Sequence, residues 1–187
     1  MAWLKGSKPG TNTMTIAEIL DLYEYNRWAH ERCLEAVSDF SSQQYGEKLI
    51  GSFPSLRATL EHLLATEVVW LSRWEGHSLG EAPDYGGCKD VMSLKSLWNS
   101  FWNRQRSFLE ALAEEDLSQL IAIRTRSGIE TVQQLGDTLI HVVNHSTYHR
   151  GQIATQIRQL GATPPSTDYF IYCLGRTVEQ PGDDVPT

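Results

Sequence analysis

The stretch at residues 140–157, IHVVNHSTYHRGQIATQI, carries three histidines at intervals of four residues: His141, His145 and His149. Side chains four residues apart lie on the same face of a helix, so two neighbouring imidazoles of this series can reach one ion. Apolar residues recur around them at helical spacing. The stretch therefore predicts a long helix over 131–160 with a metal-binding face.

Three further segments show the same helical periodicity, and we expect helices over 15–37, from about 52–54 to 74, and over 93–113. Thr15 followed by Glu18 is typical of a capping box at a helix start. Four long amphipathic helices joined by loops indicate an all-α protein, a four-helix bundle. Bundles of this kind build metal sites from side chains on facing helices.

Shorter elements are predicted at the connections. The glycine-rich segment 75–90 is expected to be a loop. Residues 120–126 alternate weakly and indicate either a short strand or an extended linker. A short extra C-terminal helix is expected over 167–174, after the proline pair that ends the fourth helix.

The chain of 187 residues is long enough for one domain with its own core. We expect a flexible N-terminal extension over 1–13, the helical bundle domain over 14–174, and a flexible tail over 175–187. A start at Met14 is an alternative.

The composition excludes several classes of function. A formal net charge of −7 argues against broad binding of nucleic acid or of an anionic membrane, since both require a basic face. The three cysteines, Cys33, Cys88 and Cys173, form no CxxC pair and predict reduced thiols in the cytoplasm. No signal peptide and no apolar run long enough to cross a membrane is present in the sequence.

One ion cannot take all three histidines of the helix at 131–160. His141 and His149 are eight residues apart, roughly 12 Å along a helix axis, whereas imidazole holds zinc at roughly 2.0–2.1 Å. The apolar face of the helix decides between the two pairs, because His149 lies closest to its centre, His145 next and His141 farthest. We therefore predict His145 and His149 as ligands and place His141 nearer solvent.

A third ligand must come from another helix, since a catalytic zinc usually has three protein ligands and an open position. His62 is the best candidate because it lies midway along the second predicted helix, on a face with small side chains. His30 on the first helix is the second choice, and His77 in the glycine-rich loop is the third. The predicted metal site is thus His62, His145 and His149.

Three nearby residues have two interpretations each. Glu67 either hydrogen-bonds a ligand histidine or forms a surface ion pair. Tyr148 and Arg150 flank His149, and each either orients a substrate or lies on the surface.

The motif at residues 141–153, HVVNHSTYHRGQI, resembles the signature of the DinB/YfiT-like family of metal-dependent proteins. The segments 25–29 (YNRWA), 60–64 (LEHLL) with Trp70, and 164–168 (PPSTD) are also similar to the family, so the resemblance covers about 14–174. It implies a metal held by three histidines, which match His62, His145 and His149. The position of His30 is more typically Asn in the family, so the resemblance gives His30 no role.

The resemblance also implies a function linked to thiols, because relatives include S-transferases and isomerases that use low-molecular-weight thiols. Our leading hypothesis is an enzyme that uses a divalent metal ion to activate a small thiol or water against an electrophilic substrate, as a transferase, isomerase or hydrolase. Zinc or nickel is the expected metal, with iron as a further option, since imidazole suits several divalent ions. A cytoplasmic homodimer without nucleic-acid or membrane partners is expected.

Two other functions stay open on the sequence. The first is a non-catalytic protein of a stress response that binds a metal or a small ligand, because a three-histidine site looks the same in both cases. The second is a purely structural dimer of bundles in which the histidines fill space. The sequence identifies no catalytic residue beyond the predicted metal ligands.

Overall fold

The protein was analysed as a computed structural model that describes residues 14–77, 83–85, 88, 90–124 and 128–178. The predicted extension at 1–13 and residues 179–187 of the predicted tail lie outside the described residues. Half of the glycine-rich connection at 75–90, between the second and third long helices, does too.

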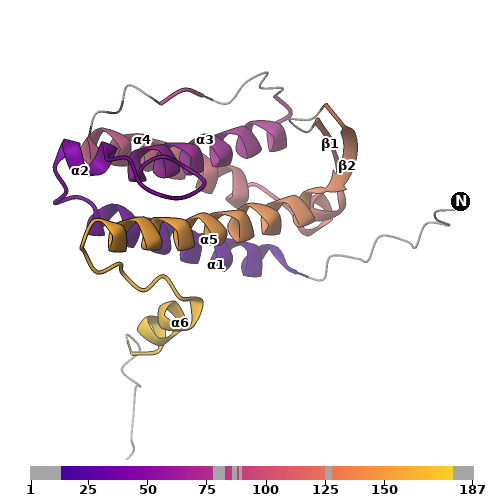
Figure 1. Cartoon of the computed structure of the whole chain (residues 1–187). Coiled ribbons are helices and arrows are strands. Elements are labelled where there is room, and N and C mark those ends of the chain that lie inside the picture. The colour runs from indigo at the N-terminus through magenta and orange to yellow at the C-terminus, as the bar shows by residue number, and fades with distance from the viewer. Residues whose placement is uncertain (1–13, 78–82, 86–87, 89, 125–127, 179–187) are drawn as a thin grey trace, which may run out of the picture.

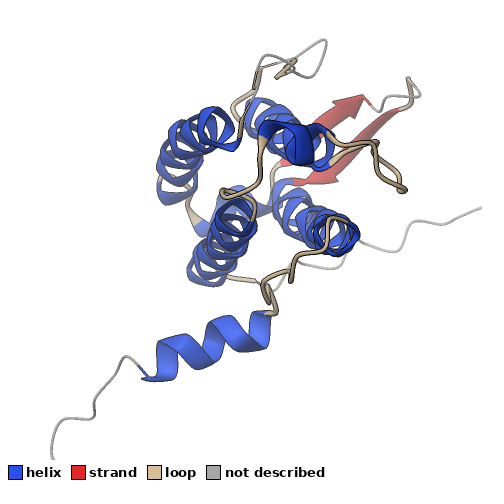
Figure 2. Cartoon of the chain, turned by 60° about the vertical axis from the view of Figure 1, so that its left-hand side comes forward, coloured by secondary structure: helices blue, strands red, loops and turns tan. Residues whose placement is uncertain are grey.

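Four long helices form the bundle that the sequence predicts (Figure 1): α1 (Ile16–Ala36), α3 (Leu56–Trp74), α4 (Val91–Glu110) and α5 (Leu135–Gln159). Helix α5 packs against α1 and α3, and α4 packs against the same two helices from the other side (Figure 2). The core between them is apolar and includes the fully buried side chains of Leu60, Leu64, Trp98 and Leu139. The predicted fold class is confirmed.

Side-chain caps set the starts of these helices. Thr15 and Glu18 form the predicted capping box at α1, with both reciprocal hydrogen bonds present. Ser55 caps α3 and Asp90 caps α4, each by accepting a hydrogen bond from a backbone N–H of the first turn. Helix α3 therefore begins at Leu56, slightly after the predicted start at 52–54, and α4 begins at Val91, slightly before the predicted start at 93.

The predicted start of the fourth helix is wrong. Residues Glu130–Gln134 form strand β2, which pairs antiparallel with β1 (Leu120–Arg124), and α5 begins only at Leu135. Gly128 stands before β2 with a φ of 83°, a conformation that glycine adopts without the steric cost of a Cβ. Of the two alternatives for 120–126, the strand is the one observed over 120–124, and residues 125–126 lie outside the described residues.

Two short helices were not predicted, α2 (Ser42–Gly46) and the 3-10 helix η1 (Glu114–Ser118). The C-terminal helix α6 (Tyr169–Val178) ends four residues beyond the predicted end at 174. It lies outside the ring of four helices (Figure 2) and rests on α1, where the ring of Tyr25 contacts Tyr169 and Tyr172. Among the described helices, none combines the length and the apolar character needed to span a bilayer.

Candidate metal centre

The histidines of α5 differ in burial as the helix face predicts. His149 is 5% exposed, His145 is half-buried and His141 is exposed. His141 packs its ring against Trp70 of α3, with ring centroids 5.2 Å apart. The α5 pair nearest the core is thus His145 and His149.

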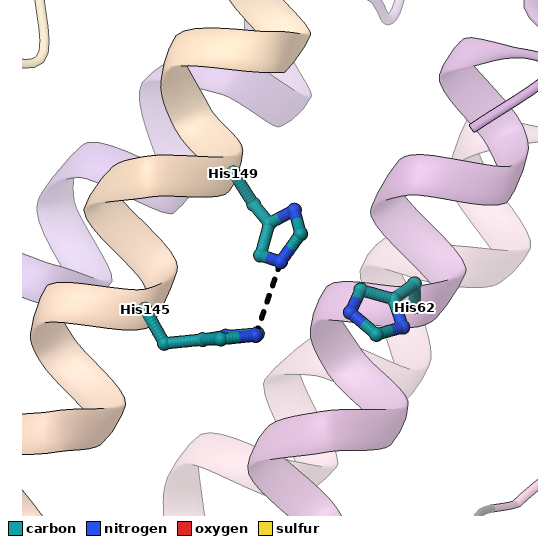
Figure 3. Close-up of side chains that lie close together, drawn as sticks. All are labelled: His62, His145 and His149. Atoms are coloured by element: carbon teal, nitrogen blue, oxygen red, sulfur yellow. Dashed lines mark hydrogen bonds between the residues drawn. The ribbon is translucent and has the colours of Figure 1, made fainter. Parts of the chain in front are cut away.

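His62 on α3 faces this pair across the contact between the two helices (Figure 3). One ring nitrogen from each of His62, His145 and His149 lies within 4.8 Å of the others. Among the described residues, these three make up the only group of three or more His, Cys, Asp or Glu side chains with such spacing. The structure therefore brings together the three residues that the sequence predicts as ligands.

The donor geometry fits a divalent ion. The Nε2 atoms of His145 and His149 are 3.0 Å apart (Figure 3). Two nitrogens that each bind zinc at about 2.05 Å with tetrahedral angles are roughly 3.3 Å apart. An ion bound here would require this pair to open by about 0.3 Å and the His62 nitrogen, which lies within 4.8 Å of both, to turn toward the ion.

The electrostatics of the cluster favour neutral imidazoles, the form that binds metals. Burial, with smaller contributions from the neighbouring His149, His62 and His141, lowers the pKa of His145 to about 4. Burial also lowers the pKa of His149, against a smaller opposite effect of its hydrogen bond with Gln152. Near pH 7 both imidazoles are therefore neutral, and each carries a lone pair on one ring nitrogen.

Two residues from the surroundings orient the ligand rings. The Nδ1 atom of His149 lies 2.8 Å from Oε1 of Gln152, one helical turn further along α5. A donor bond from Nδ1–H to this oxygen would leave Nε2 free to bind a metal. Phe53 packs its ring on His62 and His149, with centroid distances of 4.5 and 5.6 Å.

Glu67 does neither of the two things that the sequence suggests for it. Its carboxylate is fully buried and accepts hydrogen bonds from Asn26, Gln105 and Ser146, at 3.0, 3.1 and 2.7 Å. Burial raises the pKa of this carboxyl, and the three hydrogen bonds oppose that effect. Glu67 therefore ties α1, α4 and α5 to α3 rather than contacting a predicted ligand.

Arg150 belongs to the same buried network. It is 2% exposed, and its guanidinium donates to Oδ1 of Asn26 at 2.6 Å and to Oγ1 of Thr147 at 2.7 Å. Asn26 thus connects the arginine charge to the Glu67 carboxylate. Both alternatives for Arg150, substrate contact and surface position, are wrong.

Comparisons with known proteins agree with this architecture. The sequence model of the DinB family matches residues 10–180. The chain belongs to the DinB family. It is 28% identical over 166 residues to "Protein DinB" of Bacillus subtilis, an alignment that covers 85% of this chain and 95% of that protein. It is 20% identical to the uncharacterized protein YizA of the same organism, over 86% of this chain and 97% of that one.

A solved structure shows the same fold. The crystal structure of a DinB-like protein from Bacillus cereus superposes with a TM-score of 0.66, over 81% of this chain and 97% of that chain, at 20% identity. The predicted resemblance to the DinB family is confirmed for family and fold.

The other histidines of this DinB-family chain lie away from the cluster. His30 is buried against Trp98, with ring centroids 4.7 Å apart, and its Nε2 is 3.5 Å from the Glu67 carboxylate. Burial and the nearby Arg150 charge hold the pKa of His30 well below its usual range. His77 is exposed just after α3. Neither joins the three predicted ligands.

Tyr148 is the one flanking residue that stays near the site. It is 65% exposed, and its ring centroid is 5.3 Å from that of His149. The sequence reasoning missed Phe53 and Gln152. The glutamine was detectable from its position three residues after His149, but the phenylalanine reaches the site from a loop that has no local signal.

Proposed function

We propose that this protein is a metal-dependent enzyme that activates a small thiol, or water, against an electrophilic substrate. The observation that carries the proposal is the convergence of three histidines from two facing helices, with one ring nitrogen of each within 4.8 Å of the others, at a partly exposed place in the bundle. A divalent ion bound there would keep a position open and lower the pKa of a thiol or water at that position.

The chain's own residues would supply orientation. Gln152 holds the ring of His149, and Phe53 limits the movement of His62 and His149. Tyr148 presents an exposed hydroxyl-bearing ring on the same side and is suited to contact a substrate.

The reaction for a thiol would be a substitution. The thiol gives up its proton to solvent, its sulfur forms a bond to an electrophilic carbon, and the bond from that carbon to the leaving group breaks. The leaving group departs with the electron pair and takes up a proton. With water as the nucleophile the same sequence is a hydrolysis.

The test begins with metal content, measured by mass spectrometry on untagged protein beside a His145→Ala/His149→Ala double variant. We expect about one divalent ion per chain in the wild type and none in the variant. Absence of metal from both, even after reconstitution with zinc and with nickel, would overturn the proposal.

The second step measures turnover on the loaded protein with a panel of small thiols and electrophiles, by loss of free thiol. Full metal loading without turnover across the panel would favour the alternative of a metal-binding protein without catalysis. A homodimer in the cytoplasm remains a prediction, and light scattering of the purified protein tests its dimeric part.

A further inference from the structure

A pocket of about 310 Å³ opens on the His149 side of the candidate metal centre. Its walls come from the loop at residues 50–53 and from one face of α5. Three of its lining residues also touch predicted ligands: Phe53 contacts His62 and His149, Tyr148 contacts His149, and Gln152 lies within hydrogen-bond distance of His149. The pocket therefore borders the place where a reaction at the metal would occur.

The loop wall is held in position by three glutamines of α5, which we call the glutamine row: Gln152, Gln156 and Gln159. Their spacing places them on one helix face. Gln152 donates to Oγ of Ser52 at 3.3 Å, and Gln156 donates to the backbone oxygen of Phe53 at 3.2 Å.

Gln159 completes the row by pairing with both backbone groups of Ile50. It donates to the Ile50 oxygen at 2.9 Å and accepts from the Ile50 nitrogen at 3.0 Å. Gln156 is itself 3% exposed and accepts a hydrogen bond from Thr59 of α3. The pocket thus has a wall built by specific hydrogen bonds rather than a loosely placed loop.

The chemistry of the lining is neutral. None of the nine residues around the pocket carries a charge, although the whole chain has a formal charge of −7. The rings of Phe53 and Tyr148 and the exposed side chain of Ile50 supply apolar surface, and the amides and hydroxyls supply a few polar contacts. Such a lining suits an uncharged group, because a carboxylate or phosphate would find no cationic side chain there.

We infer that this pocket binds an uncharged, ring-bearing part of the small molecule that reacts at the metal centre. The size is sufficient, since a cavity of about 150 Å³ already holds benzene. A ring placed between Phe53 and Tyr148 would direct its substituent toward His149. The inference rests on the proposed function for the reaction itself, but the pocket and its selectivity can be tested by binding alone.

Gly151 provides a way to fill the pocket without touching a predicted ligand. It lines the pocket from within α5, and a Cβ added there meets no atom within 4 Å. A larger side chain at this position is therefore compatible with the helix and projects into free space. Gly175 of α6 is equally open and lies away from the pocket, so Gly175→Leu is the matched control for Gly151→Leu.

The experiment measures binding of three thiols to the zinc-loaded full-length protein by calorimetry: benzyl mercaptan, 2-mercaptoethanol and mercaptoacetate. We expect benzyl mercaptan to bind about 10-fold more tightly than 2-mercaptoethanol, because its ring is buried, and mercaptoacetate to bind most weakly. Gly151→Leu should abolish the preference for benzyl mercaptan, and Gly175→Leu should retain it.

Two results separate the inference from the proposed function. Equal affinities for the three thiols would overturn the inference that the pocket binds the ring, and so would a preference for benzyl mercaptan that persists in Gly151→Leu with full zinc loading. Either result would leave the proposed activation of a thiol intact. Failure of every thiol to bind would count against the proposed function instead. In that case benzyl alcohol, added to the metal-free protein and followed by ligand-observed NMR, still tests the pocket: binding that Gly151→Leu removes supports it, and absence of binding overturns it.

Discussion

Helix α5 has two faces that alternate along residues 145–150 and differ in burial and in hydrogen bonding. His145 and His149 face His62 of α3; His145 is half-buried and His149 is 5% exposed, and their ring nitrogens lie next to one another and to Gln152. Ser146 and Arg150, the residues directly after them, face a buried network around Glu67 and are 0% and 2% exposed. We call these the histidine face and the network face.

The difference teaches how a reactive site can be held in place by a rigid one. A catalytic metal site needs ring nitrogens whose lone pairs are available to the ion, and it needs one coordination position that no side chain fills. The network face has the opposite character, because its buried polar groups are largely hydrogen-bonded to one another. Since each predicted ligand of α5 is followed by a network residue, the network sets the register of the histidines against α3.

The largest effect is expected from removing single ligands on the histidine face. His62→Ala, His145→Ala and His149→Ala should each weaken metal binding by more than the roughly 10- to 100-fold that loss of an outer partner causes. Competition with a chelator on the purified variants measures this. His141→Ala is the control and should retain most of the affinity, because His141 packs on Trp70. A loss at His141 equal to the others would contradict the assignment.

Breaking the network face should lower stability rather than act first on the metal. Glu67→Ala removes the acceptor of three hydrogen bonds and leaves the buried Arg150 without a compensating carboxylate. A buried polar group left without its partner costs about 1–3 kcal/mol, and we expect a loss of at least this size in denaturant unfolding of the metal-free protein. Glu67→Gln, which keeps the shape, should lose less, and equal losses would show that the charge has no role.

Gln152 offers a finer test, because it contacts the histidine face without belonging to the network. Gln152→Ala should weaken metal binding by about 10-fold, since His149 loses the partner that fixes its ring. Gln159→Ala is the matched control: it removes a loop contact of the glutamine row but does not touch a predicted ligand. Similar metal affinities for the two variants would show that Gln152 acts only on the loop.

The smallest effect is expected from pH on folding stability. The part of this effect that is due to His30 can be distinguished from the part due to the predicted ligands. The folded-state pKa of His30 is lowered, so the unfolded chain takes up a proton first as pH falls below about 6.5, and folding stability then decreases. The raised pKa of Glu67 acts in the opposite direction. Burying its carboxylate lowers folding stability at higher pH, and this loss diminishes as pH falls toward 4.5 and the folded protein takes up the proton first.

We compare denaturant midpoints of the metal-free wild type and of His30→Asn at pH 7.5 and pH 5.5. Asparagine does not titrate, whereas the other histidines are present in both proteins. The wild type should lose more stability on acidification than the variant. An equal loss would mean that His30 does not contribute to the acid sensitivity.

The long helices and the predicted ligand set follow from short-range patterns. The spacing of apolar residues predicted α1, α3, α4 and α5, and the position of the histidines relative to the apolar face of their helix predicted which pair faces inward. The start of α5 was not predictable in this way, because residues 130–134 become a strand only by pairing with 120–124. Backbone hydrogen bonds to a partner strand are not visible in the periodicity of one segment.

The roles of Glu67 and Arg150 show the same limit. Both are charged residues, which on average lie at the surface, so their type argues for exposure. The burial of Glu67 depends on Asn26, Gln105 and Ser146, which come from the three other long helices, and the burial of Arg150 depends on Asn26 as well. No spacing along the chain reports that these residues meet.

The sequence by itself determined the helical bundle, the inward pair His145 and His149, and the candidacy of His62, because helix periodicity and the i, i+4 relation are local properties of the chain. Only the tertiary structure decided that His62 meets that pair, that Glu67 and Arg150 form a buried network behind it, and that the loop at 50–53 makes a neutral pocket beside it. These features arise where segments distant in sequence pack together, and side-chain hydrogen bonds between helices are specified by that packing alone.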